Sequence, residues 1–243
     1  MDLKELESGV DPKVHWYYQS KKKPLFSYFE KVWNIDKLPL TVIDFGAGSG
    51  FFSYELNDHY PDKINKIYLV DIGYSESELA ETAHQKIQKT HFVPENVEKG
   101  IVILMDVLEH IEDDHGIAKE IASKAKGHYF FITVPAFQGL WSGHDVFLGH
   151  YRRYTLDTLQ NRLSGTGFNI SKKYYIYFLL FFPAWIIRRI IKNNPIGEES
   201  TSDMKPLSPI INSMMLMYNS LEMKFRFLNK ICGVTCVAEG KIL

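Results

Sequence analysis

The sequence has 243 residues, of which 45% are hydrophobic, and its formal net charge is -1 at pH 7. This length suits one α/β domain with an insertion, and the balanced charge argues against a general attraction to nucleic acid. Two cysteines, Cys232 and Cys236, are too few for a disulfide framework, so we expect small core residues in a reducing compartment. The charged N-terminal stretch lacks the apolar core of a secretory signal, which indicates a cytoplasmic protein.

Strand and helix patterns alternate along most of the chain, after a helical N-terminal region over residues 1–40. The predicted strands are Thr41 to Phe45, Lys66 to Asp71, His91 to Val93, Ile101 to Asp106, His128 to Val134, Phe168 to Tyr175 and a last one at the C-terminal end. The predicted helices between them are Ser49 to Leu56, Glu76 to Lys89, Asp113 to Lys126 and Leu156 to Leu163. This order predicts an α/β fold with a doubly wound, mostly parallel seven-stranded sheet.

The stretch VIDFGAGSG places glycines at alternate positions after a buried strand, at Gly46, Gly48 and Gly50. A glycine turn between a strand and a helix lets the backbone approach a ligand closely, and the helix N-terminus favours an anionic group. The dinucleotide fingerprint requires a further glycine where this chain has Phe51, which disfavours a nicotinamide oxidoreductase. Asp71 ends the next strand, where a carboxylate can accept hydrogen bonds from a ribose diol.

The stretches VIDFGAGSG, LVDIG and VILMDVLEHIEDD resemble, in this order, the motifs of class I S-adenosylmethionine-dependent methyltransferases. The resemblance implies that S-adenosyl-L-methionine is the cofactor and S-adenosyl-L-homocysteine its product. It places the glycines at the methionine end, Asp71 at the ribose, and the adenine beside the turn after Asp71. The cofactor-binding residues that it implies are Asp44, Gly46, Ala47, Gly48, Gly50, Asp71, Ile72, Gly73, Asn96, Val97, Asp106 and Val107.

Two regions carry histidines that could take a proton from a methyl acceptor. The first is Glu109-His110, directly after Asp106, where the alternative is a structural histidine. The second is LWSGHDVFLGHYRRYT, whose GHYRRYT part resembles a methyltransferase subgroup often associated with cell-surface glycan or lipid biosynthesis. In that segment Arg152 and Arg153 could hold an anionic acceptor group, or else bridge to acids within the protein. The candidate catalytic residues are His110, His144, Asp145, His150, Tyr151 and Arg152.

The N-terminal stretch HWYYQSKKK resembles a helix that closes over the cofactor in the same subgroup, so Tyr17 is a further cofactor-binding candidate. The alternative is simple core packing of these aromatic residues. Lys21 to Lys23 are expected to be a solvated charged face. His144 next to Asp145 suggests a base with an adjacent acid.

A charge-free apolar run, Tyr174 to Ile187, follows the sixth predicted strand. It is shorter than the roughly 20 residues of a spanning helix, and Pro183 interrupts it. With its basic flanks it suits a membrane interface over residues 174–192, a hydrophobic lid, or a buried sheet edge. Ser208-Pro209 predicts a helix start, and the methionines after it are expected in a helix core. We therefore expect a core over residues 1–175, a helical cap over 176–232 and the last strand over 233–243.

These patterns together predict transfer of a methyl group from S-adenosylmethionine to a small-molecule, glycan or lipid-linked acceptor, with oxygen as the expected nucleophile. The sequence shows no recognisable metal-ligand spacing, so a metal-independent reaction is the expectation. The alternative is a scaffold or regulator that binds the cofactor without catalysis. We expect a cytoplasmic protein with peripheral contact at the inner membrane face, and no nucleic-acid partner.

Overall fold

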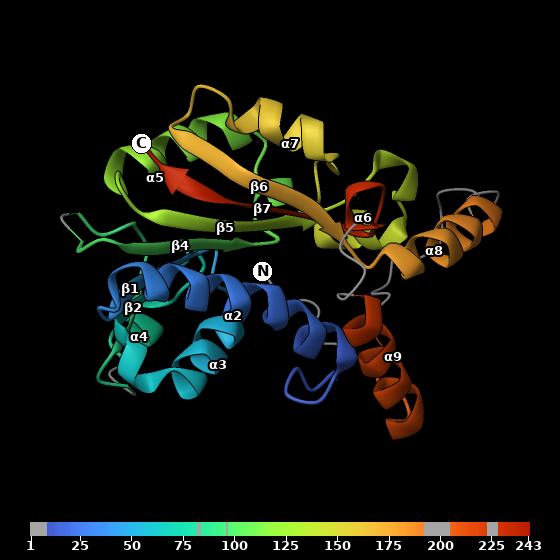
Figure 1. Ribbon diagram of the computed structural model, residues 1–243, viewed down its shortest axis with the longest axis horizontal. Coiled ribbons are helices and arrows are strands. Elements are labelled where there is room, and N and C mark those ends of the chain that lie inside the picture. The colour runs from blue at the N-terminus through green and yellow to red at the C-terminus, as the bar shows by residue number, and fades with distance from the viewer. Residues whose placement is uncertain (1–8, 82–83, 96, 192–204, 223–227) are drawn as a thin grey trace.

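A single mixed sheet of seven strands runs through the computed structural model, in the order β3-β2-β1-β4-β5-β7-β6 (Figure 1). The structure describes residues 9–81, 84–95, 97–191, 205–222 and 228–243. The first five strands are parallel to one another, and β7 is antiparallel to both β5 and β6. The strands are β1 (Leu40–Phe45), β2 (Ile64–Val70), β3 (Ile87–Thr90), β4 (Gly100–Met105), β5 (Tyr129–Pro135), β6 (Phe168–Ile176) and β7 (Thr235–Ile242). The predicted doubly wound, mostly parallel sheet of seven strands is confirmed.

Helices cover both faces of this sheet, as Figure 1 shows, with α5 and α7 on one side and α2 and α3 on the other. The helices along the chain are α2 (Trp16–Asp36), α3 (Phe51–His59), α4 (Glu76–Leu79), α5 (Asp114–Lys124), α6 (Gly143–Leu148), α7 (Leu156–Leu163), α8 (Phe178–Ile191) and α9 (Pro209–Glu222). Short 3-10 turns also occur at η1 (Pro61–Lys63), η2 (Leu108–His110), η3 (Gln138–Leu140) and η4 (Leu228–Lys230). The predicted helix starts near Asp113, Leu156 and Ser208 agree with these bounds to within a residue.

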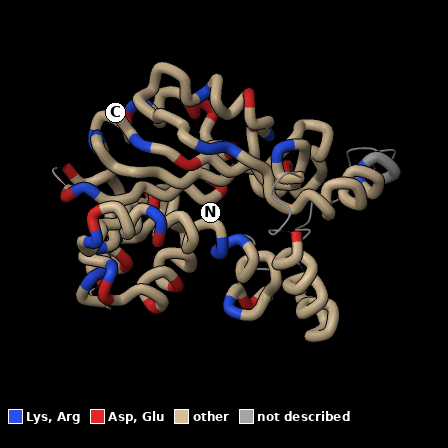
Figure 2. The backbone as a smooth tube through the Cα atoms, viewed as in Figure 1, with Lys and Arg blue, Asp and Glu red and all other residues tan. Residues whose placement is uncertain are grey.

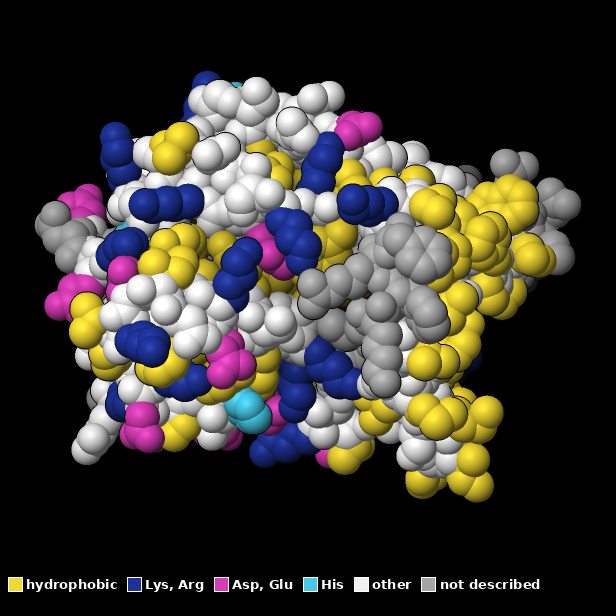
Figure 3. Space-filling model, viewed as in Figure 1, with side chains coloured by type: hydrophobic (Ala, Val, Ile, Leu, Met, Phe, Trp, Pro, Cys, Tyr) yellow, Lys and Arg dark blue, Asp and Glu magenta, His cyan; other side chains and the backbone are white. Residues whose placement is uncertain are grey.

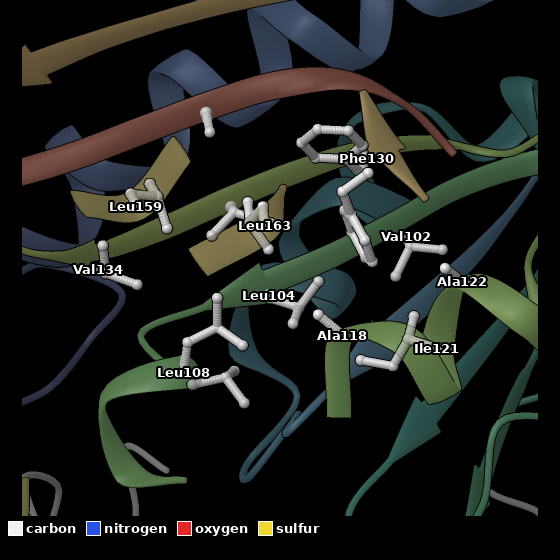
Figure 4. Packing of buried hydrophobic residues seen from close by; sticks show 14 of the residues in the cluster. Val102, Leu104, Leu108, Ala118, Ile121, Ala122, Phe130, Val134, Leu159 and Leu163 are labelled. Atoms are coloured by element: carbon white, nitrogen blue, oxygen red, sulfur yellow. The ribbon is translucent and has the colours of Figure 1, made fainter. Parts of the chain in front are cut away.

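Strand β4 shows why the sequences of the central strands are continuous runs of apolar residues. Val102 and Leu104 face the cluster under α5 and α7, which Figure 4 shows, whereas Ile101 and Ile103 face the cluster under α2 and α3. Because successive side chains point to opposite faces, a strand covered by helices on both sides is apolar at every position. All six residues of β4 are buried.

Two neighbouring predictions of secondary structure are wrong: the helix expected over Glu76 to Lys89 stops after a single turn, and the strand expected over His91 to Val93 lies earlier, at Ile87 to Thr90. A capping box between Ser75 and Glu78 starts α4, which ends at Leu79. The chain then forms β3, which pairs with β2 from Ile87 to Thr90, directly before the expected strand at His91 to Val93. As an edge strand β3 buries only Ile87 fully, so its apolar pattern was too weak to reveal it.

Helices α8 and α9 lie between β6 and β7 in the chain, at one end of the molecule (Figure 1). The predicted core position of the methionines is wrong for this helix: Met214 is 59% exposed and Met217 is 70% exposed. The fully buried residues of α9 are polar, Asn219 and Glu222. The apolar face of α9 therefore points away from the protein.

Candidate functional site

The glycine loop after β1 has a backbone that ordinary side chains disfavour. Gly46, Gly48 and Gly50 have φ angles of 69°, 54° and 74°, in the left-handed region. A Cβ atom added to Gly46 would lie 2.8 Å from a methyl group of Val107, and one added to Gly50 would lie 2.7 Å from Leu69. The glycines are thus required both by conformation and by close approach of the loop to β2 and to the end of β4.

Asp44, in the last part of β1, connects the start of the glycine loop to helix α3. Its carboxylate is 4% exposed and accepts a hydrogen bond from the Ser53 hydroxyl at 2.7 Å, in the first turn of α3. The N–H of Gly46 donates to the carbonyl of Val70 at 2.8 Å, which ties the loop to the end of β2. The structure thus supports the expectation that Asp44 orders the loop.

Asp71 lies at the end of β2, beside this loop. Its carboxylate accepts the N–H of Gly48 at 2.8 Å and the N–H of Gly73 at 2.9 Å. The adjacent Ile72 side chain is 87% exposed, and Tyr74 donates to the carbonyl of Gly48 at 2.8 Å. A partly exposed carboxylate beside an exposed apolar side chain fits a ribose next to an adenine ring.

The end of β4 brings in the N-terminal helix. Asp106 has a φ of 55° and accepts hydrogen bonds from Thr133 at 3.0 Å and from the Tyr17 hydroxyl at 3.4 Å. The Lys21 ammonium pairs with the same carboxylate and donates to the Tyr17 hydroxyl at 2.7 Å. Lys21 is completely buried, so its interpretation as part of a solvated face is wrong. A buried lysine needs such partners, because an unpaired buried charge is costly.

The remaining predicted cofactor residues are less informative. Ala47 donates its N–H to the carbonyl of Val70 at 3.2 Å, and Val107 is buried against Gly46. Val97 is partly buried and packs on the cluster beneath α5. Asn96 lies outside the described residues.

The segment after β5 is organised around a buried acid. Asp145 is completely buried and receives two hydrogen bonds from the Arg153 guanidinium, at 2.6 and 3.0 Å. The Nδ1 atom of His150 lies 2.9 Å from the same carboxylate, and the N–H of Ser142 donates to it at 2.8 Å. Burial by itself raises the pKa of Asp145, but the hydrogen bonds from His150 and the charge of Arg153 outweigh it and hold that pKa well below its usual range. Asp145 is therefore an ionised group that orients its neighbours.

Both arginines of this segment bridge to groups within the protein. Arg152 donates to the carbonyls of Ile111 and Glu112, at 2.8 and 2.7 Å, and lies 3.0 Å from the Asp114 carboxylate. These contacts favour a supporting role for Arg152 over a role in binding an anionic acceptor. Tyr151 donates its N–H to the carbonyl of Glu109 at 2.7 Å, while its side chain is 53% exposed.

Three ionisable side chains meet where this segment crosses the turn after β4. Ligand atoms of Glu109, His110 and His150 all lie within 4.8 Å of one another. The two histidine rings are perpendicular, with centroids 4.5 Å apart. Glu109 is completely buried, neither of its carboxylate oxygens has a hydrogen-bond partner in the described part of the chain, and burial raises its pKa to about 8.

The sequence selected His110 and His150 but did not select Glu109 as a site residue, and it did not foresee the contact between Asp145 and His150. In the structure Asp145 holds His150, and His144 lies beside it on α6 with its side chain partly buried. The Glu-His pair that directly follows a strand end was the one signal that could have pointed to Glu109. A separate hollow lies at the start of β6 and is lined by residues such as Gly165, Gly167 and Phe168. None of its lining side chains is ionisable.

Comparison with solved structures places this fold among methyltransferases and related enzymes. A S-adenosylmethionine-dependent methyltransferase from Archaeoglobus fulgidus is 16% identical, with 90% of this chain and 94% of that chain covered and a TM-score of 0.50. A putative sarcosine dimethylglycine methyltransferase from Galdieria sulphuraria is 12% identical, with coverages of 90% and 85% and a TM-score of 0.52. The [4+2]-cyclase SpnF is 12% identical, with coverages of 96% and 85% and a TM-score of 0.55. At these identities the likeness concerns the fold alone.

A comparison with curated protein sequences found no match. The sequence profile of a family described as a methyltransferase domain matches residues 16–173. That range contains the glycine loop, Asp71 and the Asp106 turn, whose geometry suits a bound nucleoside with a methionine tail. The chain therefore belongs to this methyltransferase-domain family, and its cofactor is S-adenosylmethionine.

Proposed function

We propose that this protein transfers the methyl group of S-adenosylmethionine to a hydroxyl oxygen of a lipid-linked acceptor, such as a lipid-linked glycan, at a membrane surface. The observation that carries this proposal is the exposed apolar face of α8 and α9, close to the segment that holds Asp145. Figure 3 shows hydrophobic side chains gathered over these two helices, and Figure 2 shows few charged residues along them. Large exposed apolar patches on folded proteins usually mark sites that bind a membrane, another protein or an apolar ligand.

Helix α9 is attached to the protein through its polar side. Asn212 accepts the N–H of Trp16 and donates to the carbonyl of Val14, both at 2.7 Å. Lys23 donates to Ser220 at 2.6 Å. The opposite stripe is exposed, at 75% for Ile210 and 50% for Leu221, with Met214 and Met217 between them. This arrangement suits a helix whose apolar face lies in a lipid interface.

Helix α8 continues the same surface. Phe182, Trp185 and Ile186 are exposed on it, at 52%, 38% and 49%. Among the described residues no helix is long and apolar enough to cross a membrane. Contact along the interface is therefore the form of membrane association that fits α8 and α9.

The helices α8 and α9 are joined to each other, and α8 is joined to the segment after β5. The carboxylate of Glu222 in α9 accepts the first N–H groups of α8, from Phe178 at 2.7 Å and Leu179 at 3.3 Å. Arg188 in α8 donates to the carbonyl of Leu140, just before the segment that holds Asp145. An acceptor resting on the apolar face would thus lie next to the residues that we assign to the chemistry.

The reaction is an in-line displacement at the methyl carbon. The C–O bond forms as the C–S bond breaks, the electron pair of the C–S bond stays on sulfur, and the hydroxyl proton passes to a base. His110 and His150, beside the turn after β4, and His144 in α6 are the candidate groups for taking that proton. The glycine loop and Asp71 orient the cofactor, whose sulfonium supplies the methyl group.

A lipid-extract assay with a deuterated methyl donor tests this function. Incubation with membrane lipids and lipid-linked glycans should place label in the lipid phase, and label that appears in no extract despite cofactor binding would favour a non-catalytic scaffold. Co-sedimentation with anionic vesicles tests the membrane part. The double variant Met214→Gln, Met217→Gln should lose vesicle binding, whereas Ile35→Gln, Leu38→Gln alters equally exposed residues on another surface and should keep it. Equal recovery of both variants would remove the membrane part.

A further inference from the structure

We infer that Glu109, His110 and His150 form a binding site for a divalent transition-metal ion such as Zn²⁺. One carboxylate and two imidazoles are a ligand set that zinc accepts, with further positions left open for water or substrate. Their ligand atoms lie within 4.8 Å of one another, so small movements of these side chains would bring all three onto one ion. This inference replaces the expectation of a metal-independent reaction.

The burial of Glu109 is the first observation that points to a ligand. Its side chain is completely buried, and within the described residues neither oxygen accepts a hydrogen bond. A buried carboxylate without partners is strongly unfavourable, and a bound cation would remove that cost. Lys21 and Arg153 act on Glu109 electrostatically, but they direct hydrogen bonds to Tyr17 and Asp145 instead.

The orientation of His150 is the second observation. Its Nδ1 atom lies 2.9 Å from the Asp145 carboxylate, which Arg153 and Ser142 hold in turn. Metal-binding histidines usually give one ring nitrogen to a carboxylate and present the other to the metal. With Nδ1 engaged in this way, Nε2 of His150 is the nitrogen left for a cation.

The position of the cluster suggests its use. Glu109 and His110 belong to η2, the turn that directly follows Asp106 and Val107 at the end of β4. A cation there would lie beside the cofactor cleft, where it could hold the acceptor oxygen and favour its deprotonation. This use rests on the proposed function, whereas metal binding itself does not. With His110 and His150 as ligands, His144 remains as the group that takes the acceptor's proton.

Calorimetric titration of the chelator-treated full chain with ZnCl₂ tests the site, with MgCl₂ as a second probe. The expected result is saturable binding of one Zn²⁺ per chain, much weaker binding of Mg²⁺, and loss of the Zn²⁺ site in Glu109→Gln and in His150→Asn. His115→Asn is the matched control, because His115 lies on α5 and contacts the carbonyl of Arg162. This control should bind Zn²⁺ as the unaltered chain does.

S-adenosylhomocysteine binding separates loss of the metal site from loss of the fold. Both site variants should bind this product as the unaltered chain does. Absence of Zn²⁺ binding by the unaltered chain would overturn the inference, and so would unchanged binding in Glu109→Gln. Neither result would bear on methyl transfer, which the lipid-extract assay measures separately.

Discussion

The sheet core and the α8–α9 pair use hydrophobic residues in opposite ways. In β4 every side chain is buried, and both faces of the strand contact helices. In α9 the apolar stripe from Ile210 to Leu221 is exposed, and the polar residues Asn212 and Glu222 make the contacts to the protein. The same helical periodicity therefore predicts a helix correctly without saying which of its faces meets the protein.

The largest expected effect compares one apolar residue from each region. Leu104→Ala in β4 should lower the free energy of unfolding by about 2–5 kcal/mol, because it leaves a cavity in the core. Met217→Ala in α9 should change it by less than about 0.5 kcal/mol, because Met217 is 70% exposed. Urea unfolding curves measure both values. A loss of more than about 2 kcal/mol for Met217→Ala would mean that the exposed stripe of α9 is part of the folding core.

An intermediate effect is expected at the cofactor edge. Asp71→Asn should weaken binding of S-adenosylhomocysteine by about 1.5–3 kcal/mol, roughly tenfold to a hundredfold, because a charged acceptor for the ribose hydroxyls is lost. Asp113→Asn is the control, since Asp113 also accepts a backbone N–H, from Gly116 at 2.9 Å, but caps the start of α5. Calorimetry measures both affinities, and equal affinities would contradict the assignment of Asp71. Met217→Ala should leave the affinity for S-adenosylhomocysteine unchanged if the α8–α9 pair is independent of the cofactor edge.

The smallest expected effect lies at the junction of the two regions. Burial raises the pKa of Glu222 above its usual value, although the N–H groups of Phe178 and Leu179 oppose the shift. Over the pH window between the usual and the raised value, the folded protein holds a proton that the unfolded chain has released. Stability therefore falls as pH rises through that window. The neighbouring Tyr177 and Cys232 have raised pKa values and do not titrate there.

Glu222→Gln removes this proton and keeps one acceptor oxygen for α8. The melting temperature of the unaltered chain should fall relative to that of Glu222→Gln as the pH rises above the usual pKa of a glutamate. Thermal unfolding followed at several pH values measures the difference. A constant difference would show that Glu222 has an ordinary pKa and that the junction is more open to water than its 2% exposure indicates.

Local patterns predicted much of the fold and the strand ends at which the candidate cofactor residues lie. Buried runs that end in Asp44, Asp71 and Asp106 placed those acids at one edge of the sheet, because parallel strands end together. The sequence did not predict the edge strand β3 at its observed position. Its pairing with β2 makes this segment a strand, and its own residue pattern does not show it. Asn96 lies outside the described residues, so its prediction stays open.

The pairings within the site could not be predicted in the same way. Lys21 looked like part of a solvated run, yet α2 places it against Asp106, which is distant in the sequence. The sequence suggested only His144 as a partner of Asp145, and the turn after α6 brings His150 to the same carboxylate. Such contacts depend on how α2 and the segment after β5 pack on the end of β4, and sequence spacing does not record that packing.

The place of β7 in the sheet has a consequence for synthesis. This strand lies between β5 and β6, so β6 joins the sheet only through β7. A ribosome completes β7 after α8 and α9, and until then β6 has no partner in the sheet. The first five strands can therefore assemble while the chain is still growing, whereas β6 pairs with the sheet after β7 has emerged. During that interval the exposed edge of β5 is open to pairing with other chains.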